Sequence, residues 1–307
     1  MRKLKSELTW SFSRDRLFSE CPRAYFYHYY ASWGGWEASA SQFCRKAYIL
    51  KNMRSIDAWI GDIVHQVIKW ILESKTGDET TLFKEGRDIP HEQAVRTAKS
   101  LLTKTWEQSR SRKWEGNVKQ NLNLFEHYYN QEPVREQLKV KLEKVANSIR
   151  NFYRSGLFAK FSKLSVENFL SIDELASFDF EGTKAFAIPD FAIRDNQEYL
   201  LYDWKTGKGS EKDILQLSCY SLFAMSKWPV SEDKIKIIPA YLAQDELLPL
   251  PVEAIASEQV KGYIRQSIEG MKGVLVDART NKADINDFAK TDNSWRCQRC
   301  KFQEICR

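Results

Sequence analysis

The cysteines of this chain are concentrated at its two ends, which constrains how those ends are placed. One of them, Cys21, lies near the N-terminus and is followed by Pro22-Arg23. Three more close the sequence with C-x2-C-x5-C spacing, as Cys297, Cys300 and Cys306. Clustered cysteines in a reducing compartment bind metal more often than they form disulfides. The distribution therefore predicts a metal-binding clasp formed by residues 13–30 and 290–307.

The spacing alone leaves the metal of this clasp open. Four thiolates suit a tetrahedral Zn²⁺ or an iron–sulfur cluster, and C-x2-C occurs in both kinds of site. Either would be structural, because loss of a clasp that joins the termini should destabilise the fold. The remaining cysteines, Cys44 and Cys219, match no such pattern. Cys219 lies within a predicted helix, where a small buried thiol is expected.

Composition limits the class of protein. With 307 residues, 43% hydrophobic and 29% charged, the chain can bury a core and form a single large domain. No stretch approaches the roughly 18 uncharged apolar residues of a membrane span, and the N-terminus lacks an apolar signal region. We therefore expect a cytoplasmic protein without a membrane partner. The net charge of +6 permits a nucleic-acid partner but also fits an ordinary solvated surface.

The first half of the chain is predicted to be mainly helical. A helix is expected over residues 9–30 with Ser13 as its N-cap, followed by an irregular segment over 31–54. An amphipathic helix follows, because apolar residues recur at helical spacing from Ile60 to Ile71. Residues 73–160 are charged and helical in pattern, and they are interpreted as a helical insertion within the single domain 1–307.

The second half alternates between strand and helix patterns. Short runs rich in β-formers predict an antiparallel meander, followed by a helix, a further strand and a final helix. The strands are expected at residues 165–172, 177–180, 184–193, 198–204 and 234–242, and the helices at 212–227 and 258–276. The fold class is therefore α/β.

A carboxylate and lysine pair is predicted at the end of one strand. Asp203 and Lys205 are two residues apart and share a face of the strand, and a hairpin with the preceding strand brings Asp190 close to Asp203. Adjacent carboxylates favour a divalent cation such as Mg²⁺ or Mn²⁺ between them. An isolated D-x-K is more often a chance pair of surface residues, but here the apolar run Leu200-Leu201-Tyr202 precedes it.

Two further positions point to the same site. His65 lies beside the apolar stripe of the helix around residue 60, four residues after Gly61. By itself it is more often a packed histidine than a metal ligand. Gln216 and Tyr220 lie four residues apart and share a helix face. That face could be directed at the carboxylates.

Taken in order, these residues resemble a known family. The chain resembles the PD-(D/E)XK nuclease superfamily and, within it, the RecB-like nucleases with an iron–sulfur cluster, such as the AddB nuclease domain. The matching motifs are Ser13 with Cys21-Pro22-Arg23, Gly61-x3-His65, Ile188-Pro189-Asp190, Asp203-Trp204-Lys205-Thr206-Gly207, Gln216-x3-Tyr220 and Cys297-x2-Cys300-x5-Cys306. Each motif is short, but six in family order make a specific signal.

The resemblance implies a fold and a role for each motif. The fold would be a restriction-endonuclease-like core, with a central mixed sheet flanked by helices. His65, Asp190, Asp203 and the Trp204 carbonyl would bind Mg²⁺ or Mn²⁺, and Lys205 would act on the attacking water or the scissile phosphate. Gln216 and Tyr220 would support the site or contact the substrate. A [4Fe–4S] cluster would be held by Cys21, Cys297, Cys300 and Cys306.

The implied function is a metal-dependent deoxyribonuclease, in particular an exonuclease on single-stranded or frayed DNA ends. Trp204 and Tyr220 could stack on bases, although such residues are more often core. A helicase, a recombination protein or a CRISPR-adaptation protein could be the partner. A motor would be a separate chain, because no G-x4-G-K-[ST] motif occurs. The alternative is a non-catalytic nucleic-acid-binding or assembly subunit with a structural zinc or iron–sulfur site.

Overall fold

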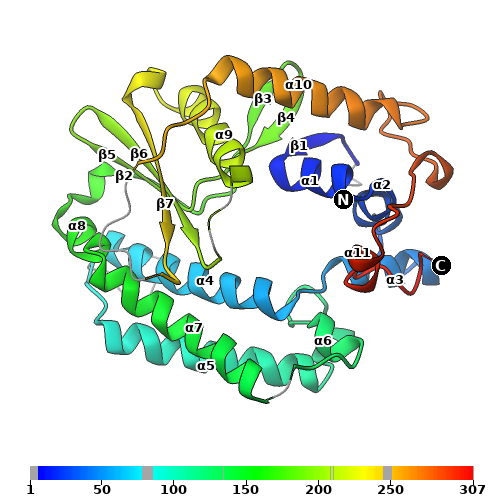
Figure 1. The fold of residues 1–307 in the computed structure, drawn as a ribbon, viewed down its shortest axis with the longest axis horizontal. Helices are drawn as coiled ribbons and strands as arrows, with labels where there is room; N and C mark the ends of the chain where they lie inside the picture. Colours follow the sequence, from blue (N-terminus) through cyan, green and yellow to red (C-terminus); the bar gives the residue numbers. More distant parts are fainter. Residues whose placement is uncertain are drawn as a thin grey trace.

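A computed structural model describes residues 6–77, 86–133, 135–207, 209, 211–244 and 251–306, without the side chains of residues 211 and 212. Parts of the predicted insertion (78–85 and 134), residue 307 of the predicted clasp and residues 1–5 of the predicted domain lie outside these ranges. Figure 1 shows a sheet region and a helical layer on one side, with both termini on the other.

One mixed sheet carries most of the predicted strands. In the described part of the chain its order is β2-β5-β6-β7, in which β2, β5 and β6 are antiparallel and β7 is parallel to β6. The strands are β2 (Phe169–Ile172), β5 (Phe191–Asp195), β6 (Glu198–Lys205) and β7 (Ile235–Tyr241). The predicted α/β class with a mixed sheet is confirmed.

A second sheet corrects the expectation of one central sheet. It contains β1 (Thr9–Ser11), β4 (Thr183–Phe186) and β3 (Phe178–Phe180), in the order β1-β4-β3. The strand predicted over 184–193 is in fact two strands, because residues 187–190 separate β4 from β5. Pro189 lies in this break, and proline cannot donate a hydrogen bond to a sheet. Asp190 therefore precedes β5 and does not lie at mid-strand as expected.

Helices cover both faces of the four-stranded sheet. On one face lie α4 (Ile56–Thr76), α5 (His91–Arg110) and α7 (Arg135–Arg154), and on the other α9 (Glu211–Lys227) and α10 (Ser257–Gly273) (Figure 1). The stripe predicted from Ile60 to Ile71 is buried against the sheet. Strand alternation divides β6 between two cores: Leu200, Tyr202 and Trp204 pack on the α4 side, and Leu201 on the α9 side.

The segment interpreted as an insertion forms helices where it is described. After α4 come α5, α6 (Phe125–Tyr128), α7 and α8 (Leu157–Lys163), and α5 and α7 pack against each other (Figure 1). No strand occurs among the described residues between 73 and 160. The apolar side of α7 enters the same core as α4, through Ile149 and Phe152.

The N-terminal region is more divided than expected. In place of one helix there are β1, α1 (Phe12–Glu20), α2 (Pro22–Phe26) and a π-helical turn (Tyr27–Ala31). Ser11, and not Ser13, caps α1 by accepting a hydrogen bond from the Arg14 amide. The region expected to be irregular contains α3 (Gln42–Lys51), capped by Ser41. A capping serine begins α1 and α3, whereas Cys21 caps α2, so the serine signal was present but was assigned to the wrong residue for α1 and missed for α3.

The two ends of the chain lie against each other. The Arg23 amide donates to the Ala289 carbonyl at 3.0 Å, and the Arg23 side chain donates to the Phe288 carbonyl at 2.7 Å. The Tyr27 hydroxyl donates to the Ile305 carbonyl at 3.1 Å. The short helix α11 (Ser294–Gln298) lies between these contacts in sequence.

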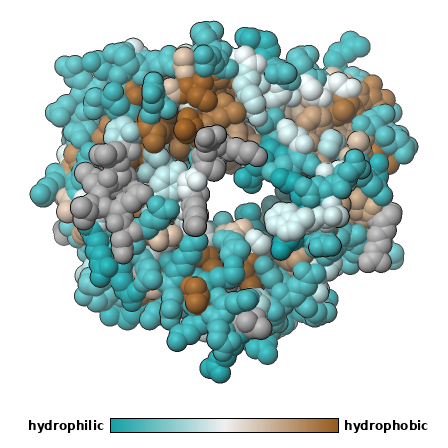
Figure 2. All heavy atoms as spheres, in the orientation of Figure 1, coloured by the Kyte–Doolittle hydropathy of each residue, from teal (hydrophilic) through white to brown (hydrophobic). Residues whose placement is uncertain are grey.

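The molecule has an open centre. Figure 2 shows an opening through the middle of the space-filling view, which in the orientation of Figure 1 falls between α4 and the α1–α2 region. β6 ends beside α4, and a Cβ at Gly61 of α4 would lie 3.4 Å from the Thr206 hydroxyl. Within the described ranges, none of the helices has the length and apolar character needed to cross a membrane.

Candidate active site

Asp203 is a buried carboxylate at the end of β6. Its side chain projects to the α9 side, where Oδ1 accepts the Tyr220 hydroxyl at 2.7 Å and Oδ2 lies 2.7 Å from the Lys205 ammonium. The residue is only 4% exposed. Apart from the Lys205 ion pair, no hydrogen bond in good geometry reaches Oδ2 from the described residues. One oxygen of this carboxylate therefore retains the capacity to accept another ligand.

Asp190 lies next to Asp203 because β5 and β6 pair in a hairpin. The register places Phe191 opposite Tyr202. Asp190, just before Phe191, and Asp203, just after Tyr202, are therefore adjacent. Oδ2 of Asp190 accepts the Trp204 amide at 2.6 Å. Burial and then the nearby Asp190 charge raise the pKa of Asp203, while Lys205 and Tyr220 lower it. The net effect is a raised pKa, as expected for adjacent buried carboxylates.

His65 joins the site from α4. Its Nδ1 lies 3.0 Å from Oδ1 of Asp190, and its Nε2 lies 2.9 Å from the Trp204 carbonyl oxygen. Both neighbours are acceptors, so both ring nitrogens donate and the ring is an imidazolium. Burial lowers the pKa of His65, but the Asp190 carboxylate, together with Asp203 and the Trp204 carbonyl, outweighs burial and raises the pKa to about 9. The Trp204 carbonyl, predicted as a metal ligand, is in this arrangement a hydrogen-bond acceptor.

Lys205 lies near acids from three segments of the chain. Burial lowers its pKa, but Asp203, Asp213 and Asp190 raise it above the usual lysine value. Asp213 was missed in the sequence. It lies on α9 three residues before Gln216, on the helix face already singled out, and that spacing was the available signal. The lysine is therefore a fixed positive charge beside the two carboxylates.

The structure brings most of the predicted site residues together, but not all of them. His65, Asp190, Asp203, Lys205 and Tyr220 form one connected set through the contacts above. Gln216 is half-buried and lies one turn before Tyr220. Within the described residues it makes no hydrogen bond to this set. Trp204 and Tyr220 are 3% and 4% exposed, so the suggestion that they stack on bases is wrong: both are core residues. The ring of Trp204 packs on the ring of Phe152, with 5.7 Å between the ring centroids.

The carboxylates of this site are of the chemical type that binds a hard divalent cation. Carboxylate oxygens suit Mg²⁺ or Mn²⁺, and Oδ2 of Asp203 has room to accept one. His65 would have to lose a proton before it could act as a ligand. In the part of the chain that the structure describes, however, no three His, Cys, Asp or Glu side chains converge closely enough to hold a metal ion. Here His65 and Asp190 are bonded to each other.

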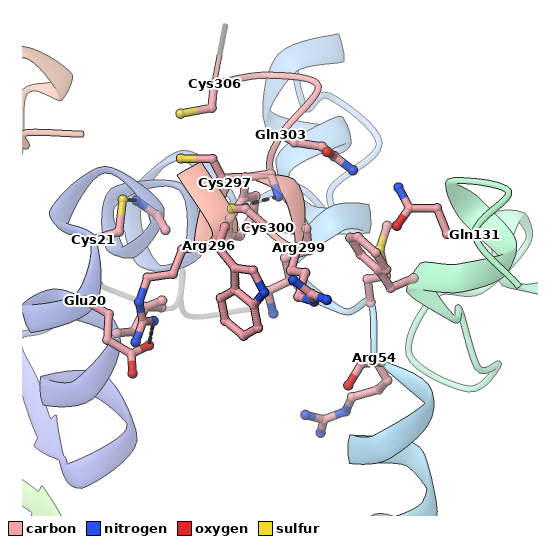
Figure 3. Close-up of a pocket in the computed structure, with 18 of the residues that line it drawn as sticks. Glu20, Cys21, Arg54, Gln131, Arg296, Cys297, Arg299, Cys300, Gln303 and Cys306 are labelled. Atoms are coloured by element: carbon pink, nitrogen blue, oxygen red, sulfur yellow. Dashed lines mark hydrogen bonds and ion pairs between the residues drawn. The ribbon is translucent and has the colours of Figure 1, made fainter. Parts of the chain in front are cut away.

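The four terminal cysteines line one pocket of about 1030 Å³. Figure 3 shows the thiols of Cys21, Cys297, Cys300 and Cys306 gathered on one side of it. All are free. The Ala24 amide donates to Sγ of Cys21 at 3.4 Å, and the Phe302 amide donates to Sγ of Cys300 at 3.4 Å.

Burial and then the neighbouring thiols raise the pKa of Cys300 to about 11. The four thiols share this pocket, but among the described residues no three of them converge closely enough to hold a metal ion. The unassigned cysteines lie elsewhere. Cys219 is buried, as expected, and donates to the Leu215 carbonyl at 3.3 Å, while Cys44 is half-buried on α3.

Comparison with known families decides the class. The sequence profile of the PD-(D/E)XK nuclease superfamily matches residues 9–307. The chain belongs to the PD-(D/E)XK nuclease superfamily. Its members are nucleases that hydrolyse phosphodiester bonds and typically use a divalent metal, so nucleic acid is the substrate class. The match does not distinguish the RecB-like iron–sulfur branch from the rest of the superfamily. Comparison with curated proteins gave no match.

Proposed function

We propose that this protein is a Mg²⁺- or Mn²⁺-dependent deoxyribonuclease that degrades single-stranded or frayed DNA ends as an exonuclease. The observation that carries the proposal is the buried Asp203, whose Oδ2 lies beside Lys205 and whose neighbour is Asp190, in a chain of this nuclease superfamily. A buried acid kept between a second acid and a lysine is costly for stability alone, which favours a functional reason for it.

Each residue has a role that follows from its contacts. Asp203 and Asp190 would hold the divalent metal, with His65 and the Trp204 carbonyl available once His65 leaves Asp190. When bound, such a metal lowers the pKa of water and offsets charge on the phosphate. The Lys205 ammonium would orient the attacking water or neutralise charge developing on the scissile phosphate. Tyr220 holds Asp203 in position through its 2.7 Å hydrogen bond.

The test is hydrolysis of end-labelled DNA with Mn²⁺ by the wild type, Asp203→Ala and Lys205→Ala. We expect both variants to lose at least about 100-fold in rate, since a positioned charge or acid–base group contributes that much or more. Asp88→Ala is the matched control, because Asp88 also pairs with a lysine (Lys75, 3.3 Å) but on the exposed surface. Equal activity in all four proteins would refute the assigned site. Labels at the 5′ and 3′ ends of single- and double-stranded substrates would give polarity and strandedness.

The cysteine pocket supports a second part of the proposal. Cys21, Cys297, Cys300 and Cys306 would hold a [4Fe–4S] cluster that stabilises the contact between the chain ends, as in the RecB-like branch. Metal analysis tests this part independently of catalysis. We expect about four iron atoms per chain and brown absorbance around 400 nm, as four cysteines bind such a cluster. A colourless protein that contains zinc and no iron would contradict the cluster assignment.

One observation favours a second candidate, a non-catalytic nucleic-acid-binding or assembly subunit. His65, Asp190 and Trp204 satisfy one another, and no metal-binding group of three converges within the described ranges. A site that stays closed in this way would bind DNA without cutting it. Wild-type protein that binds DNA, yet shows no hydrolysis with either Mg²⁺ or Mn²⁺, would establish this alternative.

A further inference from the structure

An exposed tryptophan lies on the wall of the cysteine pocket. Trp295, on α11, is 60% exposed, the highest fraction among the large aromatic residues described. The Arg299 guanidinium lies over its ring, 4.1 Å from the centroid. In the described part of the chain, Arg299 is the only cationic or aromatic group in contact with this ring. A single exposed apolar side chain is common on protein surfaces, so the groups around Trp295 decide whether it forms a binding surface.

The segment that carries Trp295 is held in place. Asn293 caps α11 by accepting the Arg296 amide at 3.1 Å. The Arg296 side chain forms an ion pair with Glu20 of α1, which Figure 3 shows at the side of the pocket. Arg296 is therefore committed to a structural contact, whereas Trp295 and Arg299 remain at the pocket surface. The indole is a fixed platform with a cation beside it.

The charges of this wall are unbalanced. Two lining cations on the C-terminal segment, Lys290 and Arg299, have no carboxylate partner among the described residues. A third, Lys301, is committed to a structural contact, because its ammonium donates to the Lys51 carbonyl at 2.7 Å. Across the pocket, by contrast, Arg54 pairs with Asp62 and Lys141 pairs with Asp57. Excess positive charge beside an exposed aromatic ring matches a ligand with both anionic groups and flat apolar rings.

We infer that Trp295 and Arg299 bind an unpaired base of single-stranded nucleic acid, with Lys290 beside its phosphates. Base stacking on an aromatic side chain with cations along the backbone is the usual mode of single-strand binding. A base inside a duplex is excluded from this contact, because both of its faces are already stacked on neighbouring bases. The inference rests on the proposed function for its substrate class, and it assigns the stacking role to a residue far in sequence from the buried Trp204 and Tyr220.

The test measures binding without cleavage. A labelled 20-nucleotide oligothymidylate and a blunt 20-base-pair duplex are titrated with Asp203→Asn protein by fluorescence anisotropy at one fixed salt concentration. Trp295→Ala, Trp295→Phe and Trp33→Ala are then added to this chain. Trp33 is the matched control, being a tryptophan that is 39% exposed but does not line the pocket. The same series in the wild-type chain without divalent metal covers the case in which Asp203→Asn does not fold.

We expect Trp295→Ala to weaken single-strand binding by about tenfold or more, in line with the loss of one stacked base. Trp295→Phe should stay within about threefold of the parent because a ring remains. Duplex binding, and all binding by Trp33→Ala, should be unchanged. Iron and zinc contents are compared in parallel, so that damage to the cysteine site is recognised as such.

Unchanged single-strand binding by Trp295→Ala, with normal metal content, would overturn the inference and leave a protein partner as the ligand of the platform. Equal losses for single strand and duplex, or for Trp295→Ala and Trp33→Ala, would also overturn it. A wild-type protein without nuclease activity would refute the proposed function alone, because these binding measurements do not depend on turnover.

Discussion

The Tyr220 hydroxyl donates a hydrogen bond to Oδ1 of Asp203 at 2.7 Å, and both residues are only 4% exposed. This bond joins α9 to the end of β6 in the core on the α9 side of the sheet. It also lowers the pKa of Asp203, against the raising effects of burial and Asp190. This structural contact therefore favours the ionised form of the carboxylate, which is the form that binds a metal.

Tyr220→Phe removes this donor while preserving the ring. Because the lost bond was to a carboxylate, the free energy of unfolding should fall by about 1.5–3 kcal/mol. The pKa of Asp203 should rise further, so the acidic limb of the rate profile should move to higher pH. Denaturant unfolding and a pH–rate profile with Mn²⁺ check both effects. An unchanged acidic limb would show that Asp203 does not limit activity there.

Lys205→Ala leaves the charge of Asp203 buried and unpaired, with consequences for stability as well as catalysis. Removing one partner of a buried ion pair costs about 3–5 kcal/mol of stability. Because the Lys205 side chain is 19% exposed, the free energy of unfolding should fall by about 3 kcal/mol in the absence of metal. Added Mn²⁺ should recover part of it, since a cation replaces the ammonium. Urea unfolding with and without Mn²⁺ measures this.

The double variant Lys205→Ala, Asp203→Asn is the control for the ion-pair argument. It removes both charges, so its loss of stability should be smaller than that of Lys205→Ala alone. Equal losses would mean that Lys205 stabilises the protein through the packing of its stem and not through Asp203.

His28 makes stability depend on pH. Burial and then the positive charges of Lys301 and Lys51 lower its pKa from 6.5 to about 2. Above pH 6.5 the ring is neutral in both states, so stability is unaffected there. Below pH 6.5 the unfolded chain gains a proton that the folded protein does not, so stability falls as the pH drops toward 2, by up to about 1.4 kcal/mol per pH unit.

His28→Phe should remove this part of the pH dependence. Its ring would keep the contact with Tyr29, whose centroid is 4.4 Å away, and it would eliminate a buried Nδ1 that has no partner among the described residues. Unfolding free energies at pH 7, 6 and 5 should diverge in favour of the variant. Parallel curves for the two proteins would show that His28 is protonated in the fold. His91→Phe, at an exposed histidine on α5, is the surface control.

Cys21→Ala tests whether the cysteine pocket stabilises the contact between the chain ends. Removal of one of four ligands should release the metal and, as the holo form is the stable one, lower the midpoint of thermal unfolding by several degrees or more, roughly 2–4 °C for each kcal/mol lost. Cys44→Ala is the matched control, since Cys44 is also half-buried but lies outside the pocket. If both variants keep the same metal content and midpoint, the pocket binds no stabilising metal.

Much of the site was predictable because local rules place it. Strand alternation puts Asp203 and Lys205 on one face, and hairpin pairing puts Asp190 beside them. The contact of His65 with Asp190, 125 residues away, depends on how α4 packs on the sheet, and periodicity does not encode that. Membership of the nuclease superfamily was likewise predictable, from the order of short motifs.

Other features depended on pairing and burial that local patterns do not reveal. β1 joins β4 in parallel across more than 170 residues, so the second sheet had no local signal. Helix α3 is short and lies a few residues after Gly34-Gly35, and its buried residues Ala47, Tyr48 and Leu50 make a brief apolar pattern, which hid its start. Trp204 and Tyr220 were considered for stacking because they flank the site, but the density of the core around β6 buries them. Trp295 drew no attention in sequence because its exposure is a tertiary property.

The hydrogen bonds between the chain ends constrain the order in which the protein folds. Tyr27 and Ile305 are 278 residues apart, and the Arg23 side chain and Phe288 are 265 apart. α2 and the turn after it can contact α1 and α3 as soon as these are synthesised, but their hydrogen bonds to Phe288 and Ile305 must wait for residues made much later. The core on the α9 side also includes Phe288, so it too is completed late. Closure of the N-terminal helices onto the C-terminal segment is therefore one of the last steps of folding.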